Sequence, residues 1–87
     1  MKTREVNIAD GNGLHARMAA QIVVLASRFS SNVSLAFKGR TANARSVIAV
    51  MLLAASVGST IRIEVSGADE VEALDAISSL LEARTAR

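Results

Sequence analysis

Apolar and polar residues alternate along the chain with a period of about 2 residues in some segments and about 3.6 residues in others. Three segments show the shorter period, which is typical of strands with one buried face; their expected inward residues are Val6 and Ile8, then Val33, Leu35 and Phe37, then Ile61, Ile63 and Val65. After the second segment, Lys38-Gly39 predicts a hairpin, because glycine accepts the positive φ of a tight turn. The chain then resumes as a fourth strand at Arg40.

Three further segments show the helical period. The first predicted helix begins near Ala16, and its expected inward stripe consists of Met18, Ile22, Leu25, Ala26 and Phe29. The second predicted helix is short and apolar. Ser46 is its expected N-cap, because a serine oxygen accepts a bond from a free backbone N–H, and its end is expected near Gly58.

The third predicted helix follows Asp69, and its expected inward residues are Val71, Leu74, Ile77 and Leu81. We expect Asp69 to cap this helix, with Glu72 three residues later as the second half of a capping box. Acidic residues at its start and Arg84 near its end would suit the helix dipole.

The predicted element order is therefore β-α-β-β-α-β-α. A sheet with one apolar face needs helices over that face, while its other face meets water. We predict one α/β domain over residues 1–87, a two-layer sandwich with an antiparallel sheet. The periodicity does not determine the order of the strands.

Composition narrows the class of protein. Hydrophobic residues make up 51% of the chain but aromatic residues only 2%, so the core must be aliphatic, and no Tyr or Trp can stack on a nucleic acid base. With no Cys and one His, we expect no metal, no cofactor and no disulfide. The longest apolar run, residues 47–55, is far shorter than the ~20 residues of a membrane span. We expect a cytoplasmic protein that neither inserts into a membrane nor binds nucleic acid directly.

The formal net charge of +2 conceals an uneven distribution of charge. No Asp or Glu lies between Gly11 and Ile61, a span that contains Arg17, Arg28, Lys38, Arg40 and Arg45. Five of the eight acidic residues lie in the last nineteen positions. A basic pole of this kind favours an acidic protein partner or a phosphate group.

The candidate chemistry lies in the segment GNGLHARMAAQ, residues 11–21, which contains the only histidine. We expect His15 at or beside the N-cap of the first helix, where unpaired N–H groups and the helix dipole favour a phosphate or carboxylate. Arg17 would add a planar cation that suits phosphate geometry. Both influences disfavour the imidazolium, which leaves a neutral, nucleophilic ring. These residues taken alone are also compatible with an ordinary exposed His and a solvated Arg.

The segment GLHARMAA, residues 13–20, closely resembles the active-site signature of HPr, the histidine-containing phosphocarrier of the bacterial sugar phosphotransferase system. Residues 38–74, KGRTANARSVIAVMLLAASVGSTIRIEVSGADEVEAL, resemble the second motif block of that family. The resemblance covers essentially the whole chain. It implies an open-faced β-sandwich, with a four-stranded antiparallel sheet in the order 1-4-2-3 and three helices on one face.

The resemblance also implies a function. His15 would accept a phosphoryl group on Nδ1 from phosphorylated enzyme I, whose own donor is phosphoenolpyruvate, and pass it to a histidine of an enzyme IIA domain. Arg17 would stabilise the phosphate. The protein would be a carrier and not an enzyme, would need no cofactor, and is expected to be a monomer.

Two further sites follow from the resemblance. Ser46 would be phosphorylated by an HPr kinase/phosphorylase, with a catabolite-control transcription factor as a further partner, although its role as a helix cap is sufficient by itself. We expect Val50 and Leu53 to face the sheet. The expected docking patch for partner proteins consists of Ala20, Val24, Ser27, Arg45, Val47, Ile48 and Met51, with Arg45 and Arg28 steering acidic partners.

One departure from the family pattern is Met18, where the family usually has Pro. We expect phosphoryl transfer to survive with an altered phosphohistidine lifetime. The departure keeps an alternative open, an HPr-like paralogue that acts mainly as a regulatory binding module or in a nitrogen-type relay. A third interpretation is a small-ligand-binding domain with an anion pocket at residues 14–18.

Overall fold

The computed structural model describes residues 1–83. In chain order its elements are β1 (Lys2–Asn7), α1 (Ala16–Ala26), β2 (Asn32–Phe37), β3 (Arg40–Asn43), α2 (Val47–Leu52), β4 (Thr60–Ser66) and α3 (Glu70–Glu82). This is the order predicted from the sequence. Arg84, which we expected near the end of the last helix, lies outside the described residues.

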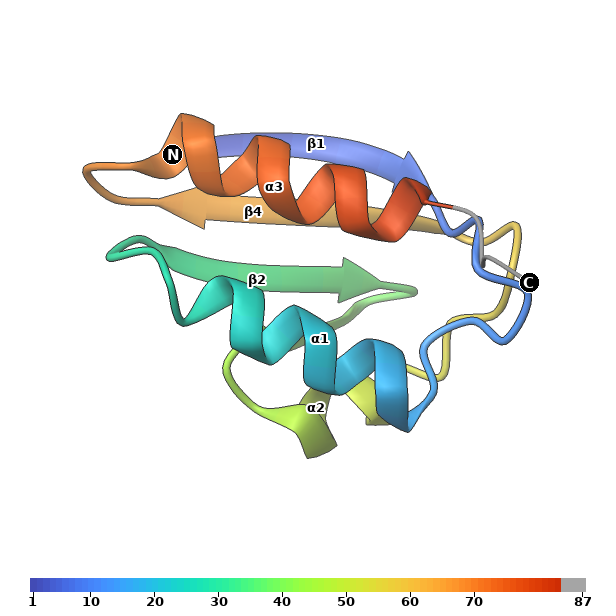
Figure 1. Ribbon diagram of the computed structural model, residues 1–87. Coiled ribbons are helices and arrows are strands. Elements are labelled where there is room, and N and C mark those ends of the chain that lie inside the picture. The colour runs from blue at the N-terminus through green and yellow to red at the C-terminus, as the bar shows by residue number, and fades with distance from the viewer. Residues whose placement is uncertain (84–87) are drawn as a thin grey trace.

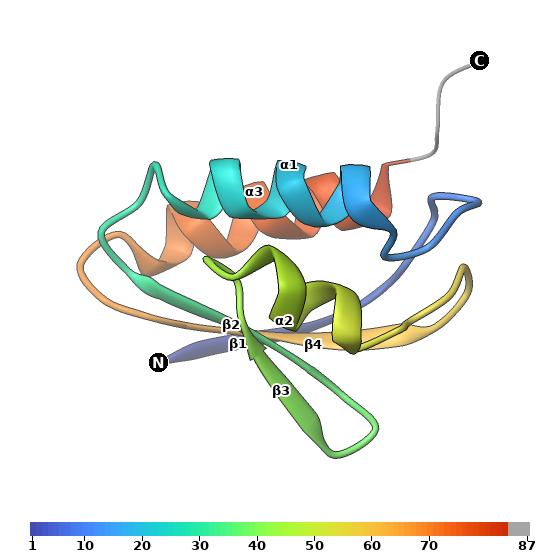
Figure 2. The same cartoon turned by 90° about the horizontal axis from the view of Figure 1, so that it is seen from below.

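The four strands form one antiparallel sheet in the order β1-β4-β2-β3. Figure 1 shows β1, β4 and β2 side by side, and Figure 2 shows β3. Figure 2 shows that all three helices lie on one face of this sheet. These features confirm the open-faced sandwich and the strand order that the resemblance implied. Because β1 ends opposite the start of β4, the loop after β1 lies beside the loop that leads into β4.

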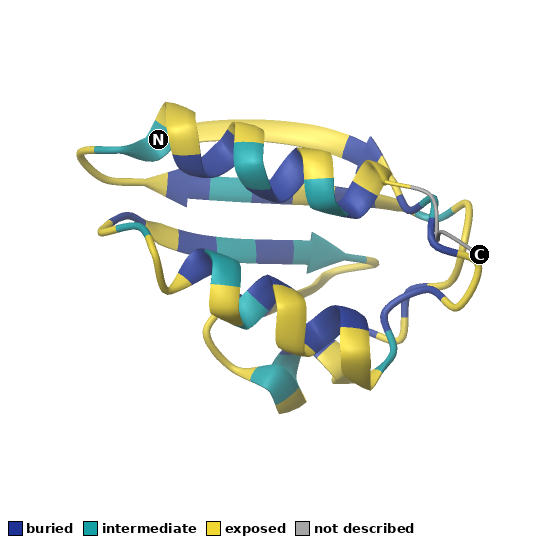
Figure 3. Ribbon diagram, in the orientation of Figure 1, coloured by how far each residue is buried: buried dark blue, intermediate teal, exposed yellow. Residues whose placement is uncertain are grey.

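The core lies between the sheet and the helices and is aliphatic. Its fully buried large side chains are Ile8, Ile22, Leu35, Ile61, Ile63, Ile77, Leu81, Val50 and Val65. Leu35 on β2 lies opposite Ile63 on β4 and Ala42 on β3, so the alternating apolar positions meet on the covered face. Figure 3 shows this alternation as buried and more exposed bands along the strands. Phe37 is only partly buried, because it adjoins the hairpin turn.

The hairpin between β2 and β3 turns at Lys38 and Gly39, as predicted. Both residues have positive φ, 50° for Lys38 and 79° for Gly39. Two successive positive φ values characterise the type I′ turn, whose twist matches that of the flanking strands. The local sequence therefore sets the register of this edge of the sheet.

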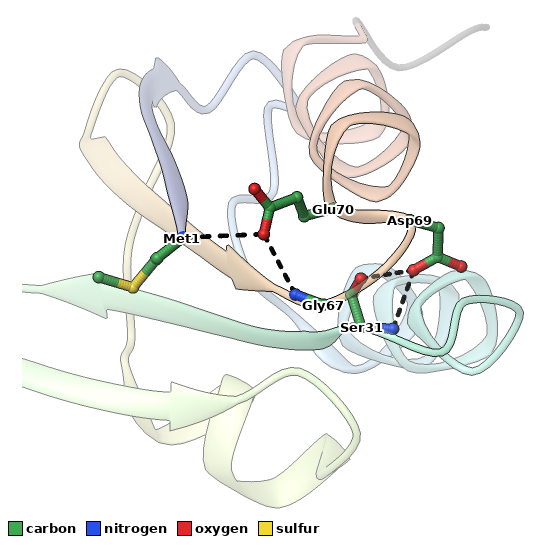
Figure 4. A network of polar contacts seen from close by, with 5 residues as sticks. All are labelled: Met1, Ser31, Gly67, Asp69 and Glu70. Carbon is green, nitrogen blue, oxygen red and sulfur yellow. Dashed lines mark hydrogen bonds and ion pairs between the residues drawn. The ribbon is translucent and has the colours of Figure 1, made fainter.

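The start of α3 differs from the prediction. Asp69 is the N-cap residue, but its side chain makes no capping bond. Its carboxylate instead accepts hydrogen bonds from the Ser31 hydroxyl and from the backbone N–H groups of Ser30 and Ser31, as Figure 4 shows in part. These bonds, that of the Ser31 hydroxyl first, lower the pKa of Asp69 to about 2. The expected capping box is therefore wrong, because a tertiary contact takes the carboxylate.

A second difference concerns Val71, which we expected to face inward but which is 51% exposed. Leu74, Ile77 and Leu81 are buried as predicted, and Ala73 and Ser78 complete the buried stripe. Val71 is the second residue of α3, and the buried residues of the helix begin only at Ala73.

Helix α2 begins as predicted and ends earlier than predicted. Ser46 is its N-cap and accepts a 3.2 Å bond from the N–H of Ala49. The helix ends at Leu52, not near Gly58, because Ala54 adopts a left-handed φ of 54° that turns the backbone away. This turn places the Ala55 carbonyl where Leu14 donates a bond to it. No helix within residues 1–83 has the length and apolar character needed to cross a membrane.

Candidate functional site at the start of the first helix

The loop that presents His15 is held against the loop that follows α2. The N–H of Leu14 donates to the carbonyl of Ala55 at 2.9 Å, and Leu14 itself is buried. Gly13 has a φ of 65°, and a Cβ at this position would lie 2.7 Å from the carbonyl oxygen of Ala55. Only glycine fits such a close approach with this backbone conformation. The two loops therefore fix where α1 begins.

His15 is the N-cap of α1, as the sequence predicted. Its backbone is extended, with φ −97° and ψ −178°, and its Nδ1 accepts a 3.3 Å hydrogen bond from the N–H of Arg17. The imidazole thus does what a serine or asparagine oxygen does at other helix starts. A nitrogen that accepts a hydrogen bond carries a lone pair, so the neutral ring holds its proton on Nε2.

The two ring nitrogens of His15 have different surroundings. Nε2 is buried and makes no hydrogen bond within the described residues, whereas the side chain as a whole is 30% exposed. The nearest acidic atom is Oδ1 of Asp10, 3.9 Å from Nε2. A reactant that arrives from solvent is therefore left with Nδ1.

The backbone N–H groups of the first turn of α1 follow His15 directly. The N–H groups of Ala16 and Met18 have no acceptor among residues 1–83, and that of Arg17 points to Nδ1. These three groups form the first turn of α1, where the helix dipole adds partial positive charge. The start of the helix is therefore a cradle for an anion next to the ring.

Two guanidinium groups extend this positive region along α1. Arg17 and Arg28 line a hollow of about 460 Å³ whose other lining residues are Ala20, Gln21, Val24, Leu25 and Leu80. Within residues 1–83, neither side chain forms an ion pair or a hydrogen bond. Both charges are therefore available to a ligand or an acidic partner.

The expected docking residues on α1 lie where the prediction placed them. Ala20 and Ser27 are exposed, and Val24 is 57% exposed. Ser27 also donates from its hydroxyl to the Val23 carbonyl at 2.7 Å. These residues therefore follow the solvent-facing side of the helix that begins at His15.

The expected docking residues on and before α2 differ from one another in how far they are exposed. Ile48 is 69% exposed and Met51 is 39% exposed, but Val47 is partly buried against the core, so the expected docking patch is less open at Val47 than at the other two residues. Val47 precedes the buried Val50 by three residues, so both lie on the face of α2 that packs on the core. Arg45 is exposed, and its guanidinium donates to the Phe29 carbonyl at 2.7 Å, which ties it to the segment after α1.

Sequence reasoning missed Asp10. Its side chain is buried, and it approaches His15 only because the loop between β1 and α1 folds back on itself. One signal for it exists in the sequence, since Asp10 is the last acidic residue before the span without acids from Gly11 to Ile61.

Comparisons with known proteins agree with this geometry. The family described as PTS HPr component phosphorylation site matches residues 2–83. The phosphocarrier protein HPr of Xylella fastidiosa (strain Temecula1) is 46% identical over 84 residues, which cover 97% of this chain and 94% of that protein.

Solved structures show the same likeness. The crystal structure of HPr from Bacillus anthracis matches with a TM-score of 0.89 and 38% identity, covering 92% of this chain and 95% of the other. Crh, a catabolite repression protein of Bacillus subtilis described as a dimer with a swapped domain, matches with a TM-score of 0.77 and 36% identity over 94% of each chain. The chain therefore belongs to the HPr family, the phosphocarriers of the phosphotransferase system.

Proposed function

We propose that this protein carries a phosphoryl group on Nδ1 of His15, which it receives from phosphorylated enzyme I and delivers to a histidine of an enzyme IIA domain. The observation that carries the proposal is the asymmetry of the ring. Nε2 is buried, whereas Nδ1 faces the backbone donors at the start of α1. We propose that it does this as a monomer in the cytoplasm, as a carrier and not as an enzyme.

The proposed transfer uses little chemistry beyond positioning. The lone pair of Nδ1 attacks phosphorus, and the bond between phosphorus and the donor breaks. The N–H of Arg17, which donates to Nδ1 in the free protein, then donates to a phosphoryl oxygen, together with the unpaired amides of Ala16 and Met18. Phosphoryl transfer depends mainly on such alignment and on stabilisation of negative charge.

The Arg17 guanidinium is the proposed charge partner of the phosphoryl group. It has no competing carboxylate within the described residues, so it can pair with the phosphate without first breaking an ion pair. A planar guanidinium can bind two phosphate oxygens at once. Arg28, further along the same hollow, lies where it can attract an acidic partner surface.

Ser46 is the proposed regulatory phosphorylation site, with an HPr kinase/phosphorylase as the modifying partner and a catabolite-control transcription factor as a reader. The residue is exposed at the start of α2. A phosphate there could take over the bond that the Ala49 N–H now gives to the hydroxyl. The exposed Ile48 lies two residues away, so the added charge would alter the proposed docking patch.

The second candidate function is a regulatory binding module that moves no phosphoryl group to sugars. The likeness to Crh, described as a catabolite repression HPr, favours it. It predicts that Ser46 is the residue that is modified, while the site around His15 stays unused. The third interpretation, a small-ligand domain with an anion pocket at residues 14–18, predicts neither modification.

One labelling experiment separates these functions. The protein is incubated with phosphoenolpyruvate and enzyme I from its own organism, and in parallel with ATP and the HPr kinase. The carrier function predicts an acid-labile label that is lost in His15→Ala and retained in Ser46→Ala. An acid-stable label from the kinase alone supports the regulatory module, and the absence of an acid-labile label overturns the carrier function.

A further inference from the structure

The carrier function leaves one feature of the site unexplained, the buried pair formed by Asp10 and the far side of the His15 ring. Nε2 of His15 is sealed from solvent and makes no hydrogen bond within residues 1–83. Oδ1 of Asp10 lies 3.9 Å from it, and Asp10 is only 7% exposed. A buried N–H without an acceptor is costly, so this arrangement points to a role for the carboxylate.

The carboxylate of Asp10 is held in place by its own loop. Its Oδ1 accepts a 2.8 Å bond from the N–H of Asn12, and its backbone carbonyl accepts a 2.9 Å bond from the N–H of Gly13. The backbone of Ala55 and Ser56 leaves no room for a Cβ at Gly13, and the next residue, Leu14, donates to the Ala55 carbonyl, which anchors the loop. The position of Asp10 relative to the ring is therefore set by the scaffold and not by a free side chain.

We propose that Asp10 is a positioning residue for phosphoryl transfer at His15. Its carboxylate accepts the Nε2–H once the ring tilts to shorten the 3.9 Å gap to a hydrogen bond. Hydrogen bonds within catalytic sites are often long before the reactant binds. This contact holds the ring in the tautomer whose lone pair lies on Nδ1, and the Arg17 N–H fixes the same tautomer from the opposite side. The purpose of the contact rests on the proposed carrier function.

The contact also stabilises the positive charge that transfer creates on the His15 ring. When Nδ1 bonds to phosphorus and the bond to the donor breaks, the proton stays on Nε2 and the ring becomes positive. The carboxylate then faces that charge across Nε2–H. When the group moves on, the electron pair returns to Nδ1 and the ring is neutral again. No proton has to enter or leave, so the residue serves both directions of transfer.

The test compares Asp10→Asn with Asp75→Asn. Both substitutions remove one negative charge, but Asp75 is exposed on α3 and pairs with Arg4, 2.9 Å away. Asparagine at position 10 keeps an oxygen that can accept the Asn12 N–H, so the loop can retain its turn. That oxygen is also the one that faces Nε2, but it is uncharged and accepts the Nε2–H more weakly than a carboxylate, so part of the population takes the tautomer in which Nδ1 carries the proton.

The first readout is the ¹⁵N NMR spectrum of His15 in the unphosphorylated protein, at a pH where the ring is neutral. The native chain and Asp75→Asn should show Nε2 protonated and Nδ1 unprotonated, with a slowly exchanging Nε2 proton. Asp10→Asn should show a mixture of tautomers or the Nδ1–H form. This readout requires no partner, so it distinguishes failure of the inference from failure of the carrier function.

The second readout is the rate of phosphorylation by phosphorylated enzyme I. Asp10→Asn should slow it by about tenfold, the lower end of what loss of a carboxylate behind a functional imidazole costs in metal sites, while Asp75→Asn should not. A native chain that carries its proton on Nδ1 overturns the proposal, and this measurement needs no variant to fold. Unchanged tautomer and rate in a folded Asp10→Asn protein also overturn it.

Discussion

Replacement of Gly13 by alanine tests the scaffold that places His15. The new Cβ would lie 2.7 Å from the Ala55 carbonyl oxygen and 2.8 Å from Cα of Ser56, both backbone atoms of the neighbouring loop. Overpacking of this kind costs about 1 to 3 kcal/mol. The left-handed φ of 65° adds about 1 to 2 kcal/mol for any residue with a Cβ. We expect Gly13→Ala to lower the free energy of unfolding by about 2 to 5 kcal/mol.

Two matched glycines separate these contributions. Gly39 has a φ of 79° and no atom within 4 Å of the position that a Cβ would take, so Gly39→Ala should show the backbone cost of about 1 to 2 kcal/mol alone. Gly11 has open space and no positive φ, so Gly11→Ala should be close to neutral. Urea unfolding measures all three, and Gly13→Ala should also lower Tm by at least about 8 °C.

The same variants report on function. The loop can relieve the contact only by moving away from Ala55, which would shift the Leu14 bond and the start of α1. We therefore expect phosphorylation of His15 to slow in Gly13→Ala and not in Gly39→Ala. If Gly13→Ala is no less stable than Gly39→Ala, the close approach of the two loops is refuted.

Substitutions at three further positions test other parts of the structure. Because the pKa of Asp69 is lowered to about 2 from 3.8, its stabilising effect is complete above pH 3.8 and is lost as the pH falls towards 2. Thermal unfolding should therefore show that the native chain loses more stability across that pH window than Asp69→Asn does. An identical pH dependence in the two proteins would count against the Ser31 contact. Ser46→Ala should lower the free energy of unfolding by about 1 kcal/mol, because the Ala49 N–H loses its acceptor, whereas Ser46→Asp should keep the cap. If urea unfolding shows that both variants lose the same free energy of unfolding, Ser46 does not act as a cap. Met18→Pro removes an unpaired amide N–H beside the proposed phosphate position, so it should change the rate of phosphohistidine hydrolysis. An unchanged rate would show that this donor does not bind the phosphoryl group.

The candidate site was predictable where the signal is local. The end of the loop, the start of the helix and the pairing of an imidazole with a nearby arginine are visible in residues 11–21. Capping involves residues only two positions apart, so His15 could be placed at the N-cap without knowledge of the fold. The inward turn of Nε2 towards Asp10 could not be predicted, because it depends on how Gly13 fits against Ala55 and Ser56.

The sequence by itself determined which face is buried in β1, β2 and β4, the hairpin at Lys38-Gly39 and the N-cap at Ser46, because each depends on neighbours a few residues away. Its periodicity did not determine the strand order, which needed the family resemblance and which the tertiary structure confirms. Only the tertiary structure decided that Asp69 binds Ser31, 38 residues earlier, instead of capping its own helix. Contacts of that kind depend on which segments the sheet brings together, and no local pattern of polar and apolar residues records them.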